Sequence, residues 1–345
     1  MSRCFKRIGW IAVLVLATVA AGIRPSVRSA NAAVLHKKPI PRITFTNLSP
    51  PYKNYDYFQN NRQVPFEYDA AAFSRINAWW LAEASTLVYA DEAFVEQEFC
   101  RAGFDHVRFF NRAGTQCFVA ADSRFAIVAF RGSEIWKRGT PFDPGRIIAD
   151  LKTDFDVWRS PWDRGGNVHS GFKAALDDVW DELRPEIERL QARGMRIWIT
   201  GHSLGGALAT LAADRLGSVQ GVYTFGSPRV GDAQFRAGFT SNAYRVVNGA
   251  DFITSVPPRG PYHHVGTRIH IDPQAHGGYR PASMEGPHEF PCPPGDDACE
   301  HDRDRQAIDA AMFIPPAIRD HVPLLYAIFL WNELVAQLNN DAPSK

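Results

Sequence analysis

Residues 196–210 read R-I-W-I-T-G-H-S-L-G-G-A-L-A-T. The apolar run at 196–200 predicts a short strand, and the small residues after the serine predict a helix. Between strand and helix stands G-x-S-x-G, a spacing that places a serine on a strained turn with its hydroxyl exposed above a sheet. Gly201 and Gly205 leave room where the helix start crowds the strand. Ser203 is therefore predicted to be a catalytic nucleophile.

The sequence around this segment alternates between strand and helix patterns. Apolar runs predict strands at 107–110, 116–120, 125–130, 196–200, 221–225 and 244–247, and helical spacing predicts helices at 69–99, 171–192, 204–216 and 323–338. Pro185 is expected to kink or break the helix in which it lies. Residues 257–316, rich in Pro, Gly and His, are interpreted as loops. This alternation indicates an α/β fold with a mainly parallel central sheet and flanking helices.

Composition sets the class of protein. The chain has 345 residues and a formal net charge of +1, and its hydrophobic and charged fractions are ordinary for a globular protein. A near-neutral chain offers no basic face, so no nucleic-acid partner is expected. Residues 33–68 are interpreted as an extended N-terminal segment lying on one catalytic domain, residues 69–345.

The N-terminus has the pattern of a targeting segment. Basic residues within 3–7 precede an apolar run at 8–21, and Ala30-Asn31-Ala32 fits a cleavage signal. The run is shorter than the roughly 18 to 20 residues that span a bilayer, which disfavours the alternative of an uncleaved anchor. Residues 1–32 are therefore predicted to be a cleaved signal peptide. The protein is then exported, either secreted or periplasmic, and its mature chain has no transmembrane segment.

Four cysteines remain after the predicted cleavage: Cys100, Cys117, Cys292 and Cys299. An even number in an oxidising compartment favours disulfides. The local pairs Cys100–Cys117 and Cys292–Cys299 are expected, as one of three possible connectivities. The alternative is a metal site built from Cys292, Cys299 and His301, but this spacing does not match a zinc pattern. No metal is expected.

Five stretches in this order resemble the fungal-type triacylglycerol lipases, also called class 3 lipases. They are A-F-R-G-S at 129–133, I-A-D at 148–150, V-H-S-G-F at 168–172, I-T-G-H-S-L-G-G-A-L-A at 199–209 and T-F-G-S-P-R-V-G at 224–231. The similarity extends over about 69–332. It implies the α/β-hydrolase fold and a serine hydrolase that acts on acylglycerols without a cofactor.

A nucleophilic serine needs a base and an acid that orients the base. In α/β hydrolases the chain order is serine, acid, histidine, with the acid after a strand. Asp251 follows the strand predicted at 244–247 and precedes a proline-containing loop, as in the family. Asp232 is the competing acid, and we expect it to cap a helix that begins at Ala233.

The base is less evident, because seven histidines follow the acid. His321 is preferred: it precedes the last apolar helix, and residues 320–326 resemble the family's final His-to-Tyr segment. His264 is the second candidate, in a His-Val-Gly-Thr segment that the family also has.

Two backbone donors are expected to stabilise the oxyanion. The N–H of Leu204 directly follows the nucleophile. The resemblance implies Ser133 as the other donor, with Asp150 orienting its hydroxyl.

The resemblance also implies a lid between Ser133 and Asp150. Trp136, Phe142, Ile147 and Ile148 are its candidates for covering the site in water and turning toward a lipid surface. This stretch is longer than expected for the fungal enzymes and richer in Pro and Gly.

The expected activity is hydrolysis of acylglycerol esters, with a lipid or ester substrate met at a lipid–water interface. The alternatives are a phospholipase A1, a short-chain or aromatic esterase, a serine acyltransferase, and a catalytically silent lipid-binding homologue. The sequence leaves chain-length preference and oligomeric state open.

Overall fold

The structure is a computed structural model that describes residues 34–133, 158–276 and 314–340. Its centre is a seven-stranded sheet with the spatial order β1-β2-β3-β6-β7-β8-β9. The strands are β1 (His106–Arg112), β2 (Thr115–Ala121), β3 (Phe125–Phe130), β6 (Arg196–His202), β7 (Gly221–Phe225), β8 (Ala243–Asn248) and β9 (Thr267–Ile271). β1 to β3 pair antiparallel, and every pairing from β3 to β9 is parallel. A short second sheet joins β4 (Arg159–Pro161) to β5 (Asn167–His169).

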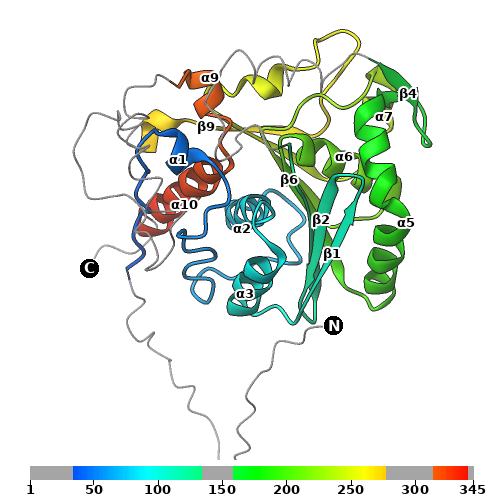
Figure 1. Ribbon diagram of the computed structural model, residues 1–345. Coiled ribbons are helices and arrows are strands. Elements are labelled where there is room, and N and C mark those ends of the chain that lie inside the picture. Colours follow the sequence, from blue (N-terminus) through cyan, green and yellow to red (C-terminus); the bar gives the residue numbers. More distant parts are fainter. Residues whose placement is uncertain (1–33, 134–157, 277–313, 341–345) are drawn as a thin grey trace, which may run out of the picture.

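Helices cover both faces of the sheet (Figure 1). The helices are α1 (Phe45–Leu48), α2 (Arg75–Leu87), α3 (Glu92–Ala102), α5 (Ser170–Ala192), α6 (Leu204–Leu216), α7 (Ala233–Gly238), α9 (Pro316–Arg319) and α10 (Pro323–Asn340), with 3-10 turns η1 (Phe252–Ser255) and η2 (Pro273–His276). One hydrophobic core joins α2, α3 and α10 to one face, and a second joins α5 and α6 to the other. The predicted α/β fold with a mainly parallel sheet and flanking helices is confirmed.

The predicted Cys100–Cys117 disulfide is wrong, because both thiols are free. Side chains alternate between the two faces of a strand, and Cys117 on β2 points into the core shared with α5. Cys100 is exposed on α3, which covers the opposite face, where Phe99 packs on Phe118 with ring centroids 5.1 Å apart. Cys292, Cys299 and His301 lie outside the described residues.

Three local predictions also change. The single helix expected over 69–99 is two helices, because the Asp91 side chain caps a new helix by accepting from the Phe94 N–H. Pro185 does not break its helix: α5 runs through it, with buried side chains such as Leu183 and Ile187 on both sides. β9 is a strand inside the stretch interpreted as loop. Its sequence does not predict a strand, because most of its side chains are exposed and it has no apolar pattern.

The N-terminal segment is fastened to the helices by a buried ion pair. Lys38 Nζ lies 3.0 Å from Glu83 Oε1 on α2, and the Tyr55 hydroxyl donates to the same oxygen at 2.7 Å. The backbone of Lys38 also exchanges two hydrogen bonds with the Asn332 amide on α10. Among the described residues, no helix combines the length and apolar character needed to cross a membrane.

Candidate active site

The predicted nucleophile lies where β6 turns directly into α6. Ser203 has φ 58° and ψ −129°, a backbone conformation that is strained for a residue with a side chain. The turn is tight because the strand and the helix nearly touch: a Cβ on Gly201 would lie 2.2 Å from the Gly205 carbonyl oxygen. A Cβ on Gly205 would lie 2.1 Å from the Phe130 carbonyl oxygen of β3. Only glycine fits both positions, as the sequence predicts.

The fold brings the three predicted catalytic residues together. His321 Nε2 lies 2.9 Å from Ser203 Oγ, and His321 Nδ1 lies 2.9 Å from Asp251 Oδ2. A carboxylate only accepts, so the imidazole donates its Nδ1–H to Asp251 and accepts the serine hydroxyl hydrogen at Nε2. All three side chains are buried. This orientation lets the imidazole remove a proton from Ser203.

Asp251 is held by further donors besides the histidine. Its Oδ1 accepts from the Ile253 N–H at 2.9 Å, and its Oδ2 accepts from the Tyr326 hydroxyl at 2.6 Å. The Tyr326 oxygen in turn accepts from the Asn248 N–H at 3.1 Å. These donors stabilise the ionised carboxylate in a buried place. The ionised carboxylate can then stabilise the imidazolium that forms during catalysis.

The loops that carry the acid and the base are bonded to each other. Asp320 Oδ2 accepts from the Ala250 N–H at 2.7 Å, and the Asp320 carbonyl accepts from the Asn248 side-chain amide at 3.0 Å. These contacts join the positions adjacent to Asp251 and His321. The separation of acid and base therefore depends on these hydrogen bonds between side chain and backbone as well as on their own hydrogen bond.

A second buried imidazole packs against the base. The rings of His202 and His321 have centroids 4.4 Å apart. His202 Nε2 donates to the His321 carbonyl oxygen at 2.6 Å, so its Nδ1 accepts from the Tyr89 hydroxyl at 3.1 Å. Burial, and then the neighbouring His321, lower the pKa of His202 well below its ordinary value. His202 is therefore neutral and acts as a fixed support for the backbone of the base.

The two expected oxyanion donors belong to Leu204, directly after the nucleophile, and to Ser133, directly after a residue that lies beside it. Leu204 is the first residue of α6, so its N–H has no acceptor within the helix and remains available. The end of β3 runs beside Ser203, since a Cβ built on Gly132 would lie 3.1 Å from the Ser203 Cβ. Ser133 follows directly. Asp150 and the lid candidates Trp136, Phe142, Ile147 and Ile148 lie outside the described residues.

The competing acid and base occupy other positions. Asp232 caps α7, as expected, by accepting from the Gln234 and Phe235 N–H groups. His264 donates its Nε2–H to the Thr254 carbonyl oxygen at 2.8 Å. Burial, followed by the charge of Arg245, lowers the pKa of His264 to about 3. Neither side chain is bonded to Ser203.

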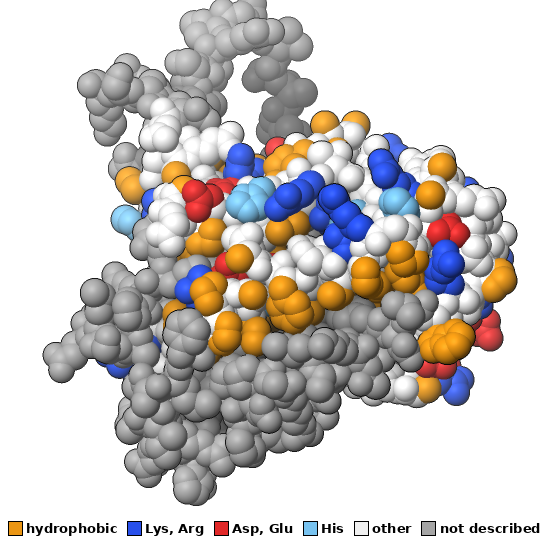
Figure 2. All heavy atoms as spheres, turned by 90° about the horizontal axis from the view of Figure 1, so that it is seen from above, with side chains coloured by type: hydrophobic (Ala, Val, Ile, Leu, Met, Phe, Trp, Pro, Cys, Tyr) orange, Lys and Arg blue, Asp and Glu red, His pale blue; other side chains and the backbone are white. Residues whose placement is uncertain are grey.

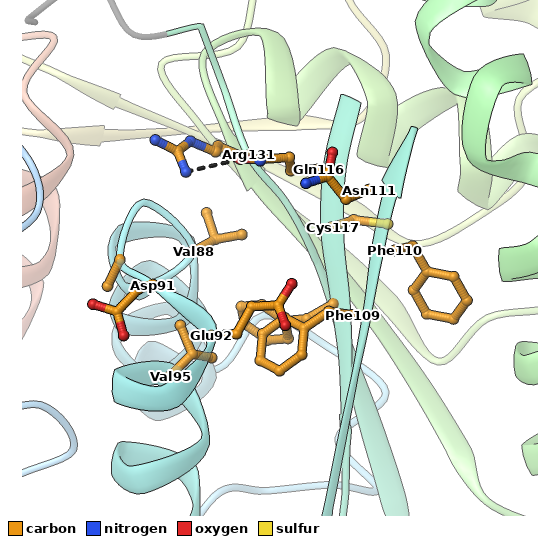
Figure 3. A pocket seen from close by; sticks show the side chains of 12 residues that line it. Val88, Asp91, Glu92, Val95, Phe109, Phe110, Asn111, Gln116, Cys117 and Arg131 are labelled. Atoms are coloured by element: carbon orange, nitrogen blue, oxygen red, sulfur yellow. Dashed lines mark hydrogen bonds between the residues drawn. The ribbon is translucent and has the colours of Figure 1, made fainter. Parts of the chain in front are cut away.

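A recess of about 210 Å³ lies between the start of α3 and strands β1 and β2 (Figure 3). Its apolar lining includes Val88, Val95 and Phe109, and Arg131 closes one side by donating to Gln116 at 2.8 Å. Ser203, Asp251 and His321 are not among its lining residues. We therefore do not assign it to the reacting ester. No group of three or more metal-binding side chains occurs within the described ranges.

The residues that support the site have no catalytic signal of their own in the sequence. His202 stands inside the G-x-S-x-G segment, and Tyr326 ends the segment at 320–326 that resembles the family. The hydroxyl of Tyr326 reaches Asp251 across 75 positions, and Tyr89 reaches His202 across 113. A buried tyrosine needs a hydrogen-bond partner, but sequence alone does not identify it.

Comparison with known proteins agrees with the expected family. The model of the class 3 lipases matches residues 127–260, which contain Ser133, Ser203 and Asp251. The secreted mono- and diacylglycerol lipase 1 of Fusarium solani is 33% identical over 158 residues, 43% of this chain and 44% of that protein. The phospholipase A1-II 6 of Oryza sativa subsp. japonica is 32% identical over 185 residues, 44% of this chain and 45% of that protein.

A solved triacylglyceride lipase of Rhizomucor miehei overlaps 59% of this chain and 82% of its own, with 24% identity and a TM-score of 0.46. The chain spans less than half the length of the two curated relatives. The family match confirms the resemblance to the class 3 lipases.

Proposed function

We propose that this protein is a serine carboxylic-ester hydrolase that acts on acylglycerols through an acyl-enzyme on Ser203. The observation that carries the proposal is the continuous hydrogen-bonded chain from Ser203 through His321 to Asp251, with both distances 2.9 Å. The strained turn at Ser203 and the free N–H of Leu204 beside it supply the other two requirements of acyl transfer.

The geometry defines the order of proton transfers. His321 Nε2 takes the proton of Ser203 Oγ as the oxygen attacks the ester carbonyl carbon. Asp251 stabilises the resulting imidazolium, and the backbone N–H groups of Leu204 and Ser133 stabilise the oxyanion. The imidazolium then protonates the leaving alcohol. Water, deprotonated by His321, attacks the acyl-enzyme and releases the acid and free Ser203.

The substrate class is supported by the relatives. The Fusarium protein is named as a secreted mono- and diacylglycerol lipase, which favours acylglycerols, and the Oryza protein as a phospholipase A1, which keeps phospholipids as the second candidate. Export is part of the proposal, supported by the signal-like residues 1–32 and by the word "secreted" in the name of the Fusarium relative. The proposed partner is a lipid or ester phase.

A hydrolysis panel tests the proposal. The purified protein is assayed on a soluble short-chain ester, a long-chain triacylglycerol, a diacylglycerol and a phosphatidylcholine, each above and below its aggregation limit. We expect acylglycerols to have the highest kcat/KM. Faster release of fatty acid from phosphatidylcholine would establish the phospholipase alternative, and absence of hydrolysis on all four would refute the ester-hydrolase proposal.

The same panel tests the proposed lid. A cover that closes over the site in water and opens at an interface makes the rate rise when the ester aggregates. Replacing Trp136 and Phe142 by Ser is expected to weaken that rise while leaving short-ester hydrolysis unchanged. A rate that saturates smoothly through the aggregation limit, in the unsubstituted protein, would contradict a lid.

A further inference from the structure

Four arginine side chains, here called the arginine cluster, gather beside the loop that follows β8. Arg245 on β8 pairs in register with Arg268 on β9, Arg229 follows β7, and Arg259 stands in the loop before β9. Burial, and then the charges of Arg268 and Arg229, lower the pKa of Arg245 to about 10. Like charges opposite one another on neighbouring strands are destabilising. The arrangement therefore opposes folding unless an anion compensates for it.

The described residues supply no such anion. None of the four arginines forms an ion pair with an aspartate or glutamate in the ranges that the structure describes, and the buried Nε of Arg245 has no hydrogen-bond partner there. Arg229 donates its Nη1 hydrogens to the carbonyl oxygens of Ser255 and, at 2.6 Å, Pro257. These bonds orient the guanidinium without neutralising its charge. His264 beside the cluster has a pKa lowered to about 3, so it adds no further positive charge.

The chemistry of the cluster suits a phosphate. Guanidinium groups present planar forks of donors that match phosphate oxygens, and such charge-assisted bonds are the strong ones. Arg259 and Arg268 are exposed, Arg245 is half-buried and Arg229 is buried. Donors are therefore available from the surface inward, so a phosphate that enters from solvent meets the exposed pair first.

The cluster adjoins the loop that carries the catalytic acid. Ser203 and Asp251 follow the C-terminal ends of β6 and β8, and Arg229 is bonded to the loop that begins at Asp251. Figure 2 views the molecule from above Figure 1 and shows basic side chains and histidines gathered across the middle of the face in view.

A nearby exposed tryptophan indicates a lipid surface as the source of the phosphate. Trp158 is 73% exposed, and its carbonyl oxygen accepts from the Tyr262 hydroxyl at 3.1 Å. Tyr262 belongs to the loop of Arg259 and forms a β-bridge with that residue. Exposed tryptophans are favoured at membrane–water interfaces, where their apolar ring and N–H both find suitable surroundings. The exposed Trp158 and the arginine cluster are therefore connected through the loop that contains Arg259 and Tyr262.

We propose that Arg229, Arg245, Arg259 and Arg268 bind the phosphate of an anionic phospholipid, so that the active-site face is held against an anionic lipid surface. This inference rests on the proposed function, because a hydrolase that acts on acylglycerols meets its substrate at a lipid surface.

The test uses the full-length protein and a matched pair of double variants. Arg259→Gln/Arg268→Gln removes the two exposed arginines of the cluster. Arg193→Gln/Arg196→Gln removes two exposed arginines next to the N-terminal end of β6, at the opposite edge of the sheet. Co-sedimentation with vesicles of phosphatidylcholine alone, or with one third phosphatidylglycerol, measures binding at 0.15 M salt.

We expect the unsubstituted protein to prefer the anionic vesicles. The cluster variant should lose about 25-fold in partition to them, since each basic side chain near an anionic surface strengthens binding about fivefold. The control variant should lose far less, and both variants should hydrolyse a soluble short ester at the unsubstituted rate. Inorganic phosphate should displace the protein from anionic vesicles more strongly than chloride at equal ionic strength.

Three results would overturn the inference. They are equal binding to both vesicle types by the unsubstituted protein, equal losses in the two double variants, and a rise in Tm with inorganic phosphate without any vesicle preference, which would identify free phosphate as the ligand. A protein that prefers anionic vesicles but hydrolyses no ester would refute the proposed function and leave the binding site standing.

Discussion

The candidate active site and the arginine cluster are linked by the loop that follows Asp251, and they differ in how their charges are matched. In the active site, Asp251 receives hydrogen bonds from His321, Tyr326 and the Ile253 N–H, so every carboxylate oxygen has a partner within the protein. In the cluster, four guanidinium groups share no carboxylate among the described residues.

The difference separates two kinds of site. A reacting centre gains from polar groups that are fixed before the substrate arrives, because no reorganisation is then needed in the transition state. A docking site for an anion keeps its donors unmatched until the ligand supplies the charge. Substitutions in the active site should therefore affect the chemical step, whereas substitutions of the exposed Arg259 and Arg268 should affect attachment to lipid and leave the chemical step unchanged.

The largest effect is expected at the nucleophile. Ser203→Ala should lower kcat for a soluble ester by roughly 10⁴- to 10⁶-fold, because no other group replaces the attacking oxygen. The thermal unfolding midpoint should stay close to that of the unsubstituted protein, since the change deletes one oxygen atom. Activity near the unsubstituted level would show that Ser203 is not the nucleophile.

The two histidine candidates are expected to differ almost as strongly. His321→Ala should match the loss of Ser203→Ala, because residues that act as a unit are not additive. His264→Ala should be far milder, since His264 is bonded to the Thr254 carbonyl and not to Ser203. Steady-state kinetics on one soluble ester decide the matter, and a reversed order would transfer the role of base to His264.

A smaller effect is expected from the support of the acid. Tyr326→Phe removes the hydroxyl that donates to Asp251 Oδ2 and leaves the ring in place. A hydrogen bond to a charged group contributes about 1.5–3 kcal/mol, so the free energy of unfolding should fall by about that amount. Urea unfolding measures it. A fall below about 0.5 kcal/mol, with unchanged kcat, would show that Asp251 does not depend on this donor.

The last effect concerns His264 and the dependence of stability on pH. Burial lowers the pKa of this imidazole to about 3, so between about 6.5 and 3 the unfolded chain binds a proton that the folded chain does not. Stability should therefore decrease as the pH falls through this window, by at most about 1.4 kcal/mol per pH unit from this group. His264→Gln should make the decrease shallower in urea unfolding series at pH 7, 6, 5 and 4. Parallel curves for the two proteins would contradict the assigned burial effect.

Local signals explain what the sequence predicts well. α6 begins at Leu204 and ends at Leu216, as expected, because the turn residues and the small-residue pattern lie within one short stretch. β3, buried along its whole length, is likewise recognised from its continuous apolar run. Asp232 caps its helix as its position predicts.

Features that depend on distant parts of the chain could not be predicted. Cys100 and Cys117 are near in sequence, but the alternation of β2 sends Cys117 to the face opposite α3. The Tyr326–Asp251 contact and the arginine cluster each join separate segments, and no single segment signals them. The mostly exposed edge strand β9 is missed because its neighbours, and not its own pattern, make it a strand.

In the proposed mechanism, Ser203 is the one nucleophilic serine and His321 activates it. The most direct measurement is covalent labelling by an irreversible organophosphate, read by intact mass and peptide mapping, in the unsubstituted protein and in Ser203→Ala and His321→Ala. We predict one adduct, on Ser203, formed together with complete loss of ester hydrolysis. We also predict no adduct in Ser203→Ala and a strongly slowed reaction in His321→Ala. An adduct on a different serine, or full labelling of His321→Ala at the unsubstituted rate, would contradict this mechanism.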